Sequence, residues 1–111
     1  MISYDQAVRG VVRYVDSEML PHMTGVKKIG LGAYTALAAK NAAQTLKGAV
    51  ESPAIAITGI ATSDGIDIDL LYNAICERMD GNVQMDIPMI GVFTVNRADV
   101  DKLYNYMRGA I

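Results

Sequence analysis

Few side chains in this sequence have the types and spacing that enzyme chemistry requires. A nucleophile needs a positioned base, and the chain has one cysteine, Cys76, and one histidine, His22, far apart in the sequence. We interpret His22, which follows Pro21 in an expected connector, as a surface residue, and Cys76 as a half-buried thiol of an amphipathic helix. Residues 30–33 lack the third glycine of a phosphate-binding loop. We therefore expect no catalytic residue and a protein that is not an enzyme.

Three aspartates near one glycine are the best candidates for a metal site: Asp64, Asp67 and Asp69, beside Gly65. If Gly65 took the sixth position of a calcium loop, Ile60 and Leu71 would stand first and twelfth, where carboxylates are needed. An irregular ion site that adds Asp99 or Asp101 stays an alternative, but helix capping and solvation explain the acids more simply. The sequence predicts no metal ligands and no cofactor.

Composition limits the remaining classes of function. The chain has 111 residues, enough for one domain over 1–111, and 51% of them are hydrophobic against 20% charged, which suits a packed core. A net charge of −2 argues against nucleic-acid binding, which usually requires a basic surplus. A single cysteine cannot form an internal disulfide, so we expect a reducing compartment.

The sequence also argues against a membrane protein. Residues 1–5 carry an acid where a signal peptide carries basic residues, so we expect no secretion through a signal peptide. The uncharged stretches Ile29–Ala39 and Ser52–Ser63 have 11 and 12 residues, and Pro53 interrupts the second. Both are shorter than the ~18–20 residues that a membrane span needs. We therefore expect a soluble protein with no membrane partner.

Residues 1–50 are expected to form a helical hairpin. Ser3 and Gln6 form the pattern of a capping box, and Pro21 is expected to end the first helix near Leu20. The second helix is expected over about Val26–Val50 and is rich in small residues, which form one candidate contact face: Gly32, Ala33, Ala36 and Ala39. This face either packs tightly against the first helix or associates with another copy of the chain.

Residues 51–111 are expected to form a second half of the same domain, which makes the chain a mostly helical α+β protein. The expected elements are a short helix, a second helix, a β-hairpin and a final helix: Ala54–Thr58, Ile68–Met79 after Asp67, Val83–Ile87 paired with Val92–Val95, and a helix after Asn96. Met89 and Ile90 would lie at the hairpin tip, where apolar residues need a covering partner or a fold-back onto a helix. They complete the list of candidate interface residues.

One internal similarity relates two of these helices. Asp67–Asn73 and Asp99–Asn105 match in pattern at an offset of 32 residues. Duplication is one explanation; we favour shared helix-start chemistry, in which acids occupy the first turn and a Leu-Tyr contact follows.

Charge is divided unequally between the two halves. Residues 1–50 hold six basic and three acidic residues, a net +3, whereas residues 51–111 hold four basic and nine acidic residues, a net −5. Opposite charges suit head-to-tail contact between copies, which generates rings or tubes. They equally suit contact between the two halves of one molecule.

The C-terminal part of the chain contains Asp86–Gly91 and Asp99–Tyr104, and the N-terminal part contains Tyr4–Ala7 and Arg13–Asp16. In these segments the sequence resembles small prophage-encoded proteins of Gram-positive gut bacteria. The resemblance includes no catalytic motif and assigns no functional residue. It implies a virion or assembly component, or a small accessory factor, in the bacterial cytoplasm or the virion.

These observations predict a non-enzymatic phage structural or assembly protein that associates with itself or docks onto a larger phage or host protein. The alternative is a small phage accessory protein that binds and inhibits a host protein through its acidic C-terminal half.

Overall fold

The computed structural model describes residues 1–51, 56–87 and 91–109. Five α-helices and two strands are assigned within them: α1 (Tyr4–Tyr14), α2 (Gly25–Lys40), α3 (Ala42–Val50), α4 (Ile68–Arg78), β1 (Val83–Ile87), β2 (Gly91–Val95) and α5 (Arg97–Arg108). The expected class, a mostly helical α+β chain, is confirmed at that level. The candidate residues Met89 and Ile90 lie outside the described residues.

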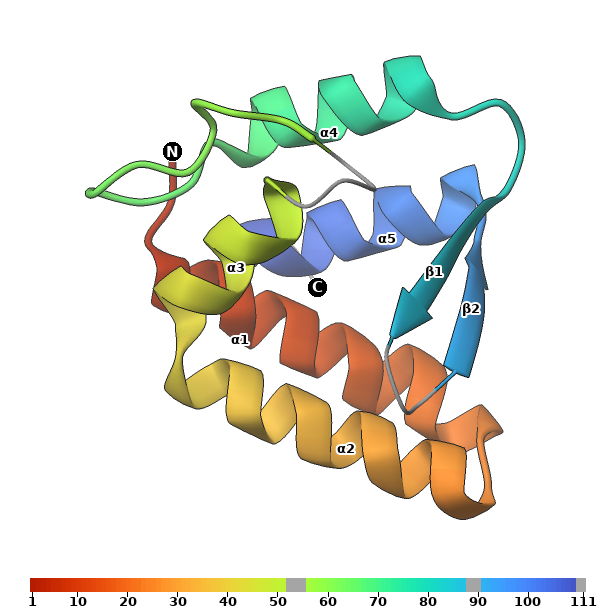
Figure 1. Ribbon diagram of the computed structural model, residues 1–111. Coiled ribbons are helices and arrows are strands. Elements are labelled where there is room, and N and C mark those ends of the chain that lie inside the picture. Colours follow the sequence, from red (N-terminus) through yellow and green to blue (C-terminus); the bar gives the residue numbers. More distant parts are fainter. Residues whose placement is uncertain (52–55, 88–90, 110–111) are drawn as a thin grey trace.

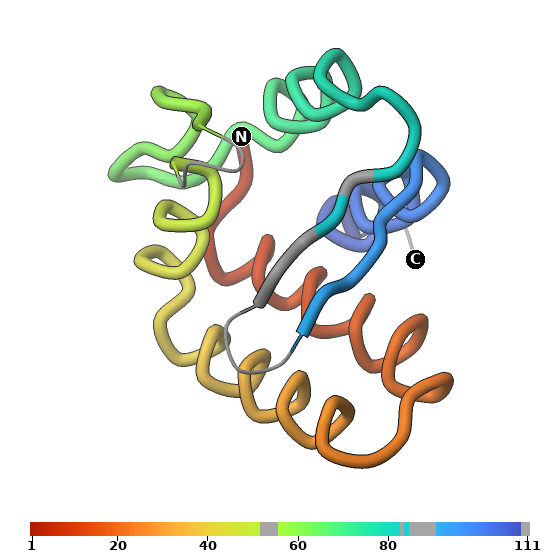
Figure 2. The backbone as a smooth tube through the Cα atoms, turned by 45° about the vertical axis from the view of Figure 1, so that its right-hand side comes forward, coloured from red at the N-terminus to blue at the C-terminus, as the bar shows by residue number. Residues whose placement is uncertain are grey.

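Four helices are arranged in the order α2, α1, α5, α4 (Figure 1). α1 packs against α2 on one side and α5 on the other, and α5 in turn packs against α4. α3 contacts α1 and α2 at one side of this arrangement. α2 and α4 therefore form its two ends, and Figure 2 shows them on opposite sides of the molecule from a second direction.

The contact between α1 and α5 depends on Gly10. A Cβ atom at this position would lie 2.4 Å from the Cα of Met107, so the two helix backbones approach more closely than a side chain permits. The Ser3 hydroxyl caps α1 by accepting from the Gln6 amide at 3.1 Å. The Gln6 side chain donates to the Met107 carbonyl at 3.4 Å and so adds a second link to α5.

The first helix changes geometry before it ends. α1 continues as a π-helical turn over Val15–Met19 and a 3₁₀ turn over Leu20–His22, which contains Pro21. The helical run thus ends close to the predicted position near Leu20. The π-helical turn carries Glu18, whose carboxylate accepts from Lys102 at 3.0 Å and from the Tyr106 hydroxyl at 3.1 Å on α5.

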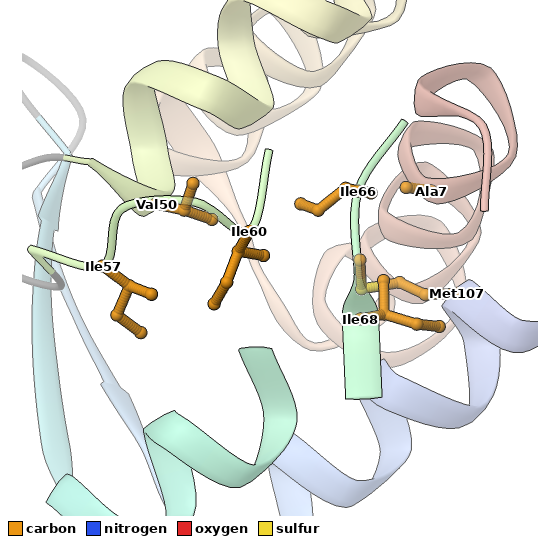
Figure 3. Close-up of a cluster of buried hydrophobic side chains, with 7 residues drawn as sticks. All are labelled: Ala7, Val50, Ile57, Ile60, Ile66, Ile68 and Met107. Carbon is orange, nitrogen blue, oxygen red and sulfur yellow. The ribbon is translucent and has the colours of Figure 1, made fainter. Parts of the chain in front are cut away.

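The core lies where the loop before α4 meets α1, α3 and α5. Figure 3 shows its buried side chains: Ala7, Val50, Ile57, Ile60, Ile66, Ile68 and Met107. Ile66 is completely buried and exchanges backbone hydrogen bonds of 3.0 and 2.9 Å with Ile2. The N-terminal residues are thereby held against this loop.

Two expected helices are wrong in part. The single helix over Val26–Val50 is interrupted at Asn41, whose side chain donates to the Leu37 carbonyl at 3.4 Å and competes with the helical backbone. A short helix was expected over Ala54–Thr58. Residues 56–58 are not helical, and residues 54 and 55 lie outside the described residues. Ile57 instead donates its amide to Val50 and buries its side chain in the core, a tertiary preference that local composition does not reveal.

The later elements begin at the predicted caps. Asp67 accepts from the Leu70 amide at the start of α4, and Asn96 forms a capping box with Asp99 at the start of α5. Between them, β1 and β2 pair antiparallel with Val83 opposite Val95. Lys27 connects α2 to β2, since its ammonium group donates to the Val92 carbonyl at 3.0 Å and lies 4.3 Å from the centroid of the Phe93 ring.

Candidate interaction surface

The outer side of α2 is an exposed apolar surface. Val26 is 83% exposed, Ile29 is 73% exposed and Leu37 is 62% exposed, whereas Leu31 and Thr35 on the opposite side are buried. Large apolar side chains gathered on an exposed helix face are typical of a surface that another protein covers. We name the exposed stripe the α2 face and define it as Val26, Ile29, Ala33, Ala36 and Leu37.

The small residues predicted to form a contact face lie in different surroundings. Ala33 and Ala36 are exposed, so the alternative of tight packing against α1 does not hold for them. Gly32 is half-buried, and apart from the nearby backbone of α2 itself no described atom lies within 4 Å of the position of an added Cβ. Ala39, also exposed, lines an open groove beside Val8 and Val12 of α1. Leu31 and Thr35, not the glycines or alanines, are the residues of α2 that are fully buried.

A hollow adjoins the α2 face on the side of α3. It has a volume of about 360 Å³, and Tyr34 and Leu37 of α2 line it together with Gln44 and Gly48 of α3. The hollow is open to solvent and has no charged lining residue among those described. It enlarges the apolar surface that a partner could cover.

The surroundings of the α2 face are basic. Residues 25–50 contain four lysines and no acidic residue, a net charge of +4. Lys28, Lys40 and Lys47 are exposed, and Lys27 is held by β2.

An acidic surface lies at the opposite end of the helix arrangement. Residues 64–80 contain five acidic residues and one arginine, a net charge of −4. On the outer side of α4, Leu70 is 55% exposed, and Asn73 and Glu77 follow it at helical spacing and are also exposed. We name these three residues the α4 face. Asp80, exposed, follows the end of α4.

No protein-family model, curated protein or solved structure matches the chain.

The repeated sequence pattern forms a reciprocal contact between α4 and α5. The Tyr72 hydroxyl donates to Asp101, and the Tyr104 hydroxyl donates to Asp69, so each copy of the pattern supplies one donor and one acceptor. The two rings are 4.6 Å apart between centroids, with an interplanar angle of 35°. The sequence pattern alone does not reveal this reciprocal contact, although the match at an offset of 32 residues is a visible signal of it.

The reciprocal contact also explains most of the shifted pKa values on α4 and α5. The hydrogen bond from Tyr72 lowers the pKa of the Asp101 carboxyl, and the same bond raises the pKa of the Tyr72 hydroxyl. The hydrogen bond to Asp69 likewise raises the pKa of Tyr104. These carboxylates hold α4 and α5 together and are not arranged around an ion.

A second polar cluster ties the π-helical turn to α5. The rings of Tyr14 and Tyr106 meet edge to face at 5.8 Å between centroids. Burial raises the pKa of the Tyr14 hydroxyl to about 12, with smaller contributions from the charges of Asp99 and Glu18. The hydrogen bond from Lys102 lowers the pKa of Glu18. We interpret this cluster as structural, because each of its hydrogen bonds joins one element to another.

The remaining candidates for chemistry stay apart. His22 is exposed, whereas Cys76 is half-buried on α4. Over the described ranges, no group of three or more histidine, cysteine or acidic side chains could hold a metal ion. Within those same ranges, none of the helices combines the length and apolar content that crossing a bilayer requires.

Proposed function

We propose that the protein is a non-enzymatic assembly component that acts by associating through the α2 face. The observation that carries the proposal is the exposure of Val26, Ile29 and Leu37 on a helix whose other side is buried. Contiguous apolar surface of this kind is typical of protein contact sites. The resemblance to small prophage proteins favours a role in a phage particle or in its construction.

The energetics favour an interface larger than one helix. Full burial of a valine, leucine or isoleucine side chain contributes about 1.5–3 kcal/mol. Scaled by the exposed fractions of 83%, 73% and 62%, Val26, Ile29 and Leu37 together supply roughly 3–6 kcal/mol. Association costs about 4–15 kcal/mol in lost freedom of motion. The hollow between α2 and α3 and the surrounding lysines are the additional surface that such an interface can use.

The test is the mass of the protein in solution as a function of concentration, measured by light scattering after size exclusion. We expect the wild-type chain to form species heavier than 11.9 kDa. Ala36→Glu should weaken association about tenfold or more, because it places a charge in the contact. The introduced carboxylate lies four residues before Lys40, an arrangement that supports the helix.

The matched control is Ala98→Glu, the same change at an exposed position near the start of α5. It should leave the mass unchanged. A wild-type protein that remains a monomer at every concentration would contradict the proposal.

A second candidate function is an accessory protein that binds a basic site on a host protein. The charge of −4 over residues 64–80 favours it, since this region offers a compact polyanionic surface. A monomeric protein that binds its target strongly at low salt and weakly at high salt would support this alternative over self-association.

A further inference from the structure

The α2 face is poorly suited to pairing with a second α2 face. A symmetric pair would bring together two segments that each carry four lysines and no acid, and like charges at a contact are repulsive. The surface that complements α2 must therefore be acidic, with an exposed apolar side chain at its centre.

The chain itself presents such a surface. The α4 face has Leu70 in its first turn and Glu77 in its last, and Asp80 follows the helix. Leu70 lies on an α-helix, whereas the other exposed large hydrophobic residues outside α2 in the described ranges, Met1 and Val92, do not. Val92 lies beside Lys27 and so belongs to the α2 end of the molecule.

We propose that the α2 face of one copy binds the α4 face of the next copy, in a head-to-tail contact; this inference rests on the proposed function. In this contact Leu70 packs onto Ala33 and Ala36, whose small side chains leave a depression between the larger side chains of Ile29 and Leu37. The acids at the end of α4 then lie within reach of the lysines around α2.

The position of the two faces determines what this contact builds. α2 and α4 lie at opposite ends of the helix arrangement in both views, so one copy can use both faces at once (Figures 1 and 2). A head-to-tail contact produces a ring when its rotation closes and a filament when it does not. The molecule measures 37 × 32 × 28 Å, so the expected repeat per copy lies within this range of widths.

The test blocks each face separately and then combines the blocked proteins. Ala36→Glu leaves the α4 face intact, and Leu70→Lys leaves the α2 face intact while keeping a residue that favours helix. We expect each variant alone to have a mass near 11.9 kDa, and an equimolar mixture to form a 1:1 complex of twice that mass. Ala98→Lys, which adds the same positive charge at an exposed position on α5, should assemble like the wild type. Far-ultraviolet circular dichroism establishes that each variant is folded.

The outcomes separate this inference from the proposed function. If the wild-type chain associates but Leu70→Lys associates equally well, the partner surface is not α4; the inference fails and self-association through α2 stands. Failure of the two variants to combine, when each alone is folded and monomeric, also overturns the inference. If the wild-type chain never associates, the proposed function fails as well. Because salt screens the attraction between the lysines and the acids, the mass of the wild-type assembly should also decrease at high salt.

Discussion

The close approach of α1 and α5 at Gly10 gives a prediction whose sign depends on the geometry. Gly10→Ala would place a methyl group 2.4 Å from the Cα and 2.7 Å from the amide nitrogen of Met107, and 2.7 Å from the Tyr106 carbonyl. Non-bonded carbon atoms prefer separations of about 3.5–4.0 Å. The two helices must therefore move apart by about 1 Å, since backbone atoms cannot rotate away as a flexible side chain does.

The magnitude follows from two opposing effects. Overpacking of a close contact costs about 1–3 kcal/mol, and the backbone contacts at Gly10 place this substitution at the upper end. Replacing glycine by alanine inside a helix recovers about 1 kcal/mol. We expect Gly10→Ala to lower the free energy of unfolding by about 2 kcal/mol.

Gly48→Ala is the matched control, because Gly48 lies in α3 and, apart from the nearby backbone of α3 itself, no described atom lies within 4 Å of its added methyl group. It should raise the free energy of unfolding by up to about 1 kcal/mol. The assay is urea unfolding followed by circular dichroism at low protein concentration. With a slope of about 1–2 kcal/mol per molar urea, the midpoint of Gly10→Ala should fall by about 1–2 M. Equal stabilisation by both substitutions would refute the close approach of α1 and α5.

Two further predictions concern the core and the reciprocal contact. Ile66→Ala should lower the free energy of unfolding by about 2–5 kcal/mol, because Ile66 is completely buried. The exposed control, Ile29→Ala, should leave the stability of the monomer nearly unchanged. Equal losses of stability in urea unfolding would contradict the burial of Ile66. Because the Asp101 carboxyl has a lowered pKa, its contribution to stability is present at neutral pH and is lost as the pH falls below the unfolded carboxyl pKa of about 4. Tyr72→Phe should therefore reduce the dependence of the urea midpoint on pH in this acidic range, whereas the control Tyr34→Phe should not. If the midpoint of Tyr72→Phe depends on pH as strongly as that of the wild type, the hydrogen bond from Tyr72 to Asp101 is not the cause of the pH dependence.

Helix starts were predictable from the sequence because capping is local. Ser3, Asp67 and Asn96 each accept a hydrogen bond from an amide three residues later, so the residue type and a short spacing are sufficient. The interruption at Asn41 and the irregular path through 56–58 were not predictable in this way. The first depends on a side chain competing with the helix, and the second on burial of Ile57 by residues distant in sequence.

The candidate surface was predictable in its location but not in its composition. The pattern of small residues indicated a contact face on α2. The most exposed large side chains of that helix, however, are Val26 and Ile29, which do not belong to the pattern. Which side of an apolar helix faces solvent depends on its packing partners, and the sequence of α2 gives little preference between its sides. The contacts of Tyr72 and Tyr104 were hidden for a similar reason, because each partner lies on the other helix.

The meeting of α1 with α5 also has a consequence for how the chain folds. Helical proteins usually fold quickly because their contacts are local in sequence, but here the first and last described helices form a central contact of the molecule. During synthesis, α1 must wait until α2, α3, α4 and the hairpin have been made before Met107 reaches Gly10, and until then its apolar side lacks that partner. We therefore expect the loop-closure entropy of this contact to control the folding rate, and the nascent chain to remain exposed to chaperones until α5 has left the ribosome.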